Sequence, residues 1–125
     1  MPKNIFLTEA EEKLANLIWR EENLTSPELV TLANQELGWK KSTTYTILKK
    51  LCDKDVVKNE NARVSVILTR EEQIARQNHY YIEDSFGGSL PEFVASFIRG
   101  GNISAEEVAE LKRLINEYDE DSRND

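Results

Sequence analysis

The side chains with the clearest chemical potential in this 125-residue chain are six lysines between positions 40 and 58. Six lysines against two aspartates, Asp53 and Asp55, leave a local excess of four positive charges. Ammonium groups at this density bind anions, of which nucleic-acid phosphates are a common example. A solvated helix face without a ligand has the same composition, so the spacing of the residues must decide between the two interpretations.

Side chains that catalyse reactions or hold metals are scarce. Cys52 and His79 are the only residues of their types, so an intrachain disulfide and a multi-cysteine metal site are excluded. The sequence has no glycine-rich phosphate loop, nucleophile elbow or HExxH motif. We therefore expect no enzymatic activity, no cofactor and no metal. Cys52 is either a small buried residue or an exposed redox-sensitive thiol, and the absence of an activating neighbourhood favours burial.

The lysine-rich segment has the two faces of an amphipathic helix that begins near residues 40–42 and ends near Lys54. Its apolar face has i, i+3, i+4, i+7 spacing and is formed by Thr44, Ile47, Leu48 and Leu51. The opposite face is polar and basic, without an acidic residue before Asp53. Hydroxyl and ammonium groups on a helix can reach base edges and phosphates in a major groove about 12 Å wide.

These properties predict a DNA-binding helix with base contacts from Thr43 and Thr46. Tyr45 either contacts a thymine methyl or phosphate or simply lies along the helix. Arg63 either reaches a phosphate or is an ordinary solvated arginine beside Glu60. The predicted DNA contacts are Lys41, Ser42, Thr43, Tyr45, Thr46, Lys49 and Lys50, with Lys40, Lys58 and Arg63 as phosphate contacts.

Two further helices must hold this one in place. A capping box at Thr8 and Glu11 opens the first. Ser26 as N-cap, with Pro27 at the first helical position, opens the second, which Gly38 ends.

A β-hairpin is predicted after the basic helix. Val56 and Val57 precede, and Val64, Val66 and Ile67 follow, a turn over residues 58–63. Two helices, a basic third helix and a hairpin, in this order, predict a winged helix-turn-helix. The fold class is therefore mainly α with a small β-hairpin, followed by a helical region.

The second half of the chain is acidic. Residues 1–70 have a net charge of +1, whereas residues 71–125 have a net charge of -8. Three helices are predicted there. The first ends at Gly87 and Gly88, the second begins at Ser89, and the third begins with a capping box formed by Ser104 and Glu107. We expect a DNA-binding domain at 1–70, a helical dimerisation region at 71–118 and a disordered acidic tail at 119–125.

The apolar faces of these three helices are wide for a unit of about 55 residues, which is too small to enclose them. Packing against a second copy of the chain would bury them; packing on the winged-helix domain is the alternative. Twofold symmetry would place two basic helices one DNA turn, or a multiple of it, apart. The predicted dimerisation residues are Ile74, Tyr81, Ile82, Leu90, Phe93, Val94, Phe97, Ile98, Leu111, Leu114 and Ile115.

The order of short motifs resembles the penicillinase-repressor family, which includes the BlaI, MecI and CopY regulators. The matching segments are residues 7–11, 18–19, 24–30, 38–39 and 46–51, and the similarity extends to about residue 114. The resemblance implies a homodimeric winged-helix repressor of transcription. It also implies an inverted-repeat operator, commonly with TACA and TGTA half-sites, bound by the third helix.

The chain also departs from the family pattern. The cysteine-rich tail of the copper-responsive branch is absent, so copper sensing is not expected. In the antibiotic-responsive branch a sensor protease cuts an Asn-Phe bond in the fifth helix. The resemblance places the candidate cleavage position at Ser96 and Phe97, where only the phenylalanine is kept. Lys40 and Lys41 replace the usual Ser-Pro start of the third helix.

The function predicted from these observations is sequence-specific repression of transcription by a dimer. The partners are a double-stranded DNA operator, a second copy of the chain and, by resemblance, a sensor protease. The alternative is a protein-interaction module that uses a winged-helix scaffold without binding DNA, which the net charge of -7 favours. No apolar run is long enough to cross a membrane and residues 1–4 begin no signal peptide, so we expect a soluble cytoplasmic protein.

Overall fold

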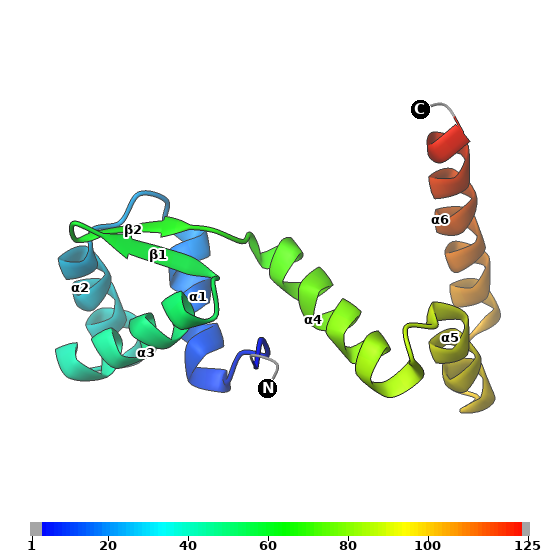
Figure 1. The fold of residues 1–125 in the computed structure, drawn as a ribbon, viewed down its shortest axis with the longest axis horizontal. Coiled ribbons are helices and arrows are strands. Elements are labelled where there is room, and N and C mark those ends of the chain that lie inside the picture. The colour runs from blue at the N-terminus through cyan, green and yellow to red at the C-terminus, as the bar shows by residue number, and fades with distance from the viewer. Residues whose placement is uncertain (1–3, 124–125) are drawn as a thin grey trace. The chain divides into compact units, whose positions relative to one another are not determined.

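The computed structural model describes residues 4–123, which form six helices and one hairpin (Figure 1). They divide into two compact units, one up to Tyr80 and one from Tyr81 onward. The first unit contains α1 (Glu9–Arg20), α2 (Ser26–Leu37), α3 (Lys41–Asp53), β1 (Val57–Glu60) and β2 (Arg63–Val66). It also contains the first part of α4 (Arg70–Phe86), so it extends ten residues beyond the predicted boundary at residue 70.

Side-chain caps define the starts of the first two helices. The capping box of Thr8 and Glu11 at α1 is confirmed. The prediction of Ser26 as N-cap of α2 is wrong, because Thr25 caps this helix and Ser26 is its first residue. Thr25 has extended backbone angles, its hydroxyl accepts from the Glu28 N–H at 3.2 Å, and the Glu28 carboxylate accepts from the Thr25 N–H at 3.0 Å.

The predicted hairpin is confirmed, with a tighter turn than the sequence indicates. β1 and β2 are antiparallel, and Glu60 pairs with Arg63. Asn61 and Ala62 alone form the turn, with φ of 52° and 61°, so both are in the left-handed region that two-residue hairpin turns require. The Ser26 N–H donates to the Ala62 carbonyl at 2.7 Å, which ties the hairpin tip to the start of α2.

One apolar core holds α1, α2, α3 and the hairpin together. The predicted inner positions of α3 (Thr44, Ile47, Leu48 and Leu51) are all buried, as are Leu14 and Ile18 of α1. The Trp19 Nε1–H donates to the Leu68 carbonyl at 2.9 Å and so fastens α1 to the segment before α4. The sequence-predicted winged helix-turn-helix is therefore the fold of this unit.

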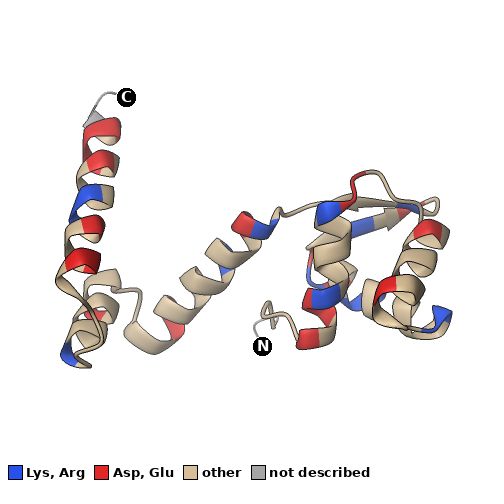
Figure 2. Cartoon of the chain, turned by 180° about the vertical axis from the view of Figure 1, so that it is seen from behind, with Lys and Arg blue, Asp and Glu red and all other residues tan. Residues whose placement is uncertain are grey.

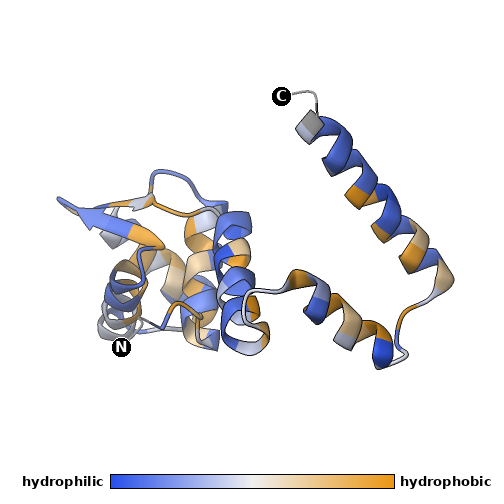
Figure 3. Ribbon diagram, turned by 45° about the vertical axis from the view of Figure 1, so that its right-hand side comes forward, coloured by the Kyte–Doolittle hydropathy of each residue, from blue (hydrophilic) through white to orange (hydrophobic). Residues whose placement is uncertain are grey.

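The second unit contains the end of α4, α5 (Leu90–Arg99) and α6 (Ala105–Arg123). Ser89 caps α5, and Ser104 forms a capping box with Glu107 at the start of α6, as predicted. The sequence predicts a disordered tail from residue 119, whereas in the structure α6 continues through residues 119–123; residues 124–125 lie outside the described residues. Figure 3 shows apolar positions at the start of α6 and hydrophilic ones toward its end.

Candidate nucleic-acid interface

The outer face of α3 has the exposure that a DNA-binding surface needs. Nine of the ten predicted contact residues are exposed, and Tyr45 is half-buried. Six of the nine are cations. They are Lys40, Lys41, Lys49 and Lys50 at α3, and Lys58 and Arg63 on the hairpin. We call these six residues the basic surface.

The hydroxyl groups on α3 differ in their freedom to contact bases. The Thr46 hydroxyl donates to the Ser42 carbonyl at 2.9 Å, so its hydrogen is occupied within the helix. The Ser42 and Thr43 hydroxyls have no hydrogen bond to any described residue. Donation to base acceptors is therefore available from Ser42 and Thr43, whereas Thr46 offers an acceptor oxygen and a methyl group.

Tyr45 lies closer to the protein than its predicted place on the outer face. Its ring packs against the core, and its hydroxyl is 3.4 Å from the hydroxyl oxygen of the buried Ser26. The side chain therefore links α3 to the first turn of α2. This geometry agrees better with the alternative interpretation of Tyr45, a tyrosine lying along the helix.

Two members of the basic surface form exposed ion pairs. Lys49 Nζ is 3.5 Å from Asp53 and Lys58 Nζ is 3.2 Å from Glu60. Pairs at such exposure contribute little free energy, about 0–1 kcal/mol, so phosphates can replace these carboxylates at small cost.

Lys54 belongs to the lysine run but not to this surface. Its side chain is 14% exposed, and its ammonium group lies 2.5 Å from the carboxylate of Glu11, whose side chain is 2% exposed. It also donates to the Phe6 carbonyl at 2.7 Å. Burial alone would raise the pKa of Glu11, but the hydrogen bonds from Lys54 and from the Thr8 N–H outweigh burial and lower it. Lys54 is thus a structural cation.

A part-buried polar network, missed in the sequence, adjoins that ion pair. Gln73 of α4 is 1% exposed and donates to the Ile5 carbonyl at 2.8 Å. Arg76 donates to the Lys54 carbonyl at 2.8 Å and to Gln73 at 2.6 Å. The first turns of α4 therefore hold the last turn of α3. The sequence gives no signal for these contacts, because the residues that meet are up to 68 positions apart.

The hairpin is positioned by the same segment that starts α2. Arg63 forms an antiparallel bridge with Thr25. The Thr25 N–H lowers the pKa of the Glu28 carboxyl that accepts from it, and the charge of Arg63 acts in the same direction. Arg63 is therefore held beside the start of α2 in the first unit.

The predicted dimerisation residues remain accessible in the single chain. Of the eleven, Ile82 and Phe93 are half-buried and the other nine are exposed, with Ile115 the most exposed at 66%. Aromatic edge contacts join Tyr81, Phe86 and Phe93 within the second unit. None of the described residues of α5 and α6 is buried, so the apolar faces have no covering within this unit.

The remaining predicted positions are also placed. Ser96 and Phe97 are exposed on α5, and the Ser96 hydroxyl donates to the Phe93 carbonyl at 2.8 Å. Cys52 is half-buried, and this burial raises the pKa of its thiol, which disfavours the reactive thiolate. In residues 4–123 no three histidine, cysteine or acidic side chains gather in a way that could hold a metal. No helix there is both long and apolar enough to span a bilayer.

Comparison with known proteins places this architecture in a family. The chain is 22% identical over 116 residues to the penicillinase repressor of Bacillus licheniformis, covering 90% of this chain and 91% of that protein. It is 21% identical over 118 residues to the methicillin resistance regulatory protein MecI of Staphylococcus aureus strain N315, covering 91% and 96%.

A solved structure, the adhesin competence repressor AdcR from Streptococcus pyogenes, aligns with a TM-score of 0.41 and 16% identity over 95% of this chain and 82% of that one. At this TM-score the likeness supports no inference. The family model for the penicillinase repressor matches residues 7–117. Because that match spans nearly the whole sequence, the chain belongs to the penicillinase repressor family.

Proposed function

We propose that this protein is a dimeric transcriptional repressor that binds an inverted-repeat DNA operator through α3. Family membership supports repression and makes the protein a regulator rather than an enzyme. The observation that carries the DNA-binding proposal is the basic surface, beside which the Ser42 and Thr43 hydroxyls have no hydrogen bond to a described residue. Its cations can neutralise phosphates while the hydroxyls meet base edges.

Dimerisation is the second part of the proposal. The apolar side chains on α5 and α6 are exposed in the single chain, and a second copy would remove them from water. An isologous interface presents the same residues from both protomers, which suits an inverted repeat. Two copies would thus offer two α3 helices to one duplex.

The basic surface and the acidic second unit have different tasks in this proposal. In Figure 2 acidic positions outnumber basic ones along α6. Acidic side chains are repelled by phosphates, so we assign DNA contacts to the first unit alone. The Ser96–Phe97 position stays a candidate for proteolytic release, in keeping with the family resemblance.

The test is selection of duplexes from a random-sequence pool by the purified full-length protein, followed by competition with unselected DNA. Enrichment of an inverted repeat, with half-site centres one DNA turn or a multiple apart, is the expected result. Recovery of no duplex at low salt, together with capture of a stable protein partner, would instead favour the interaction-module alternative.

A further inference from the structure

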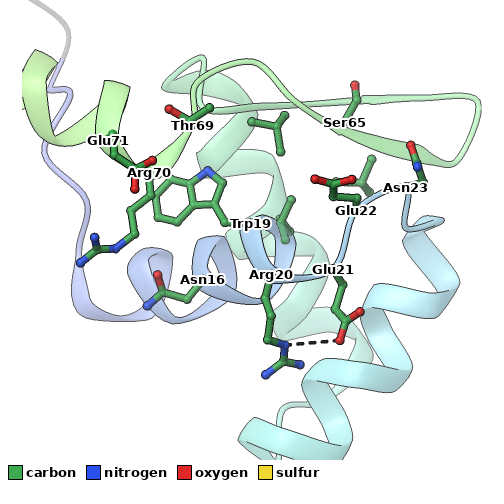
Figure 4. A pocket seen from close by; sticks show the side chains of 13 residues that line it. Asn16, Trp19, Arg20, Glu21, Glu22, Asn23, Ser65, Thr69, Arg70 and Glu71 are labelled. Atoms are coloured by element: carbon green, nitrogen blue, oxygen red, sulfur yellow. Dashed lines mark ion pairs between the residues drawn. The ribbon is translucent and has the colours of Figure 1, made fainter.

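The first unit has a second surface feature that the basic surface does not use. A hollow of about 620 Å³ lies between the end of α1, β2 and the start of α4 (Figure 4). Trp19 and Glu22 line it from the α1 side, and Ser65, Val66 and Thr69 line it from the other. Its volume is within the 300–1,000 Å³ range of small-molecule sites.

An aromatic ring forms part of the wall of the hollow. The Trp19 Nε1–H is already bonded to the Leu68 carbonyl, so the indole is fixed in orientation and needs no further hydrogen bond. Val66 of β2 is 40% exposed and adds an apolar side chain. Together they suit the apolar body of a ligand, and tryptophan is the best aromatic partner for a cation.

Glu22 supplies an uncompensated negative charge at the same place. Figure 4 shows its carboxylate between Trp19 and Asn23, below Ser65. Within the described part of the chain Glu22 forms no ion pair. Of the arginines in the lining, Arg20 is paired with Glu21 and Glu36, and the guanidinium of Arg70 extends away from Trp19.

The backbone of β2 offers a further polar contact. The Val64 N–H points away from β1, because it donates to the Leu24 carbonyl at 2.9 Å. Strand alternation gives the Val66 N–H the same direction, and no described residue outside the hairpin accepts from it. The strand pairing between Leu24–Ser26 and β2 thus stops where the hollow begins.

From these contacts we infer that the hollow is a binding site for a small organic cation, an amine attached to an apolar body. Glu22 binds the ammonium group, Trp19 and Val66 contact the apolar body, and the β2 backbone orients polar groups. This site does not depend on DNA binding by α3, so either proposal can fail without the other.

The experiment uses the full-length Trp39→Phe variant, in which Trp19 is the sole tryptophan and its fluorescence reports on the hollow. Phenethylamine is titrated beside 3-phenylpropionate and 2-phenylethanol, which have similar size but carry a negative charge or none. We expect a saturable fluorescence change with phenethylamine and much weaker binding of the other two. Amide shifts in an NMR titration should centre on Glu22, Ser65 and Val66.

Glu22→Gln in the same background should weaken phenethylamine binding by about 2- to 5-fold, the effect of losing one exposed charge. The matched control is Glu12→Gln, which removes an exposed carboxylate from the same region without touching the hollow and should leave the affinity unchanged. The inference is overturned if the three compounds bind equally, if none binds, if the amide shifts lie elsewhere, or if Glu22→Gln binds like its parent.

Discussion

Replacing Lys49 and Lys50 by alanine tests the basic surface most directly. Both ammonium groups are exposed, and only Lys49 has an ion pair among the described residues, the weak one with Asp53. The double variant removes four cations from a dimer. If each meets a phosphate, the slope of log affinity against log salt should become shallower by about 3.6, at about 0.9 per contact.

The expected magnitude follows from the number of contacts. Three to five neutralised phosphates per protomer give the unmodified protein a slope of roughly -5 to -9. Between 50 and 200 mM KCl its affinity should then fall about 10⁴-fold, whereas that of the double variant should fall only about 10²-fold. Binding should weaken for all sequences alike, because lysine contacts to phosphate carry no sequence information.

Fluorescence anisotropy of a labelled, selected duplex over a KCl series measures both slopes. Lys13→Ala is the matched control, since Lys13 is an exposed lysine of α1 whose only ion pair in the described structure is with Glu9. It should leave the slope unchanged. An equal slope for the double variant and the unmodified protein would show that α3 does not bind phosphates through these lysines.

Three further predictions concern the dimer and the fold. Ile98→Glu places a charge in the proposed dimer interface and should convert the dimer to a monomer in sedimentation equilibrium. Asn116→Glu, at an exposed polar position, is the control and should leave the dimer intact. A dimer that survives Ile98→Glu argues against this interface. Ala62→Gly should raise the free energy of unfolding by about 1 kcal/mol in urea, because Ala62 has a φ of 61° that glycine adopts without strain; lower stability would contradict this. Glu11→Gln leaves the largely buried Lys54 ammonium without its charged partner and should cost about 3–5 kcal/mol in the free energy of unfolding. Because folding lowers the pKa of Glu11, the stabilisation from its carboxylate is complete above its ordinary pKa of 4.5 and is lost as the pH falls further. The difference in the free energy of unfolding between the unmodified protein and Glu11→Gln should therefore become smaller in acid.

The sequence predicts those features of the fold that depend on local spacing. The two faces of α3 follow from the 3.6-residue period, and each predicted inner position is buried. The correct start of α2 could also have been predicted from the sequence, because Thr25 and Glu28 have the spacing of a capping box. Thr25 and Ser26 are neighbours with similar hydroxyl side chains, and only the position of Glu28, three residues after Thr25, identifies Thr25 as the N-cap.

Contacts between distant segments were beyond the reach of such patterns. Lys54 has the same residue type as its neighbours in the lysine run, yet its partner Glu11 is 43 positions away. Local periodicity predicts Gln73 as an exposed polar residue of an amphipathic helix. In the structure it is buried, and a hydrogen bond from its side chain to the Ile5 carbonyl makes this burial possible. Burial of a polar residue depends on a hydrogen-bond partner, and a partner far away in the chain cannot be identified from the neighbouring residues.

These same contacts bear on how the proposed repressor places its recognition helices. Arg76 donates a part-buried hydrogen bond to the carbonyl of Lys54, so the end of α3 is fixed to the first turns of α4. α4 then continues beyond Tyr80 into the unit that has the exposed apolar faces. The polar network, rather than the basic surface, would determine how rigidly each α3 follows the position of its own α4.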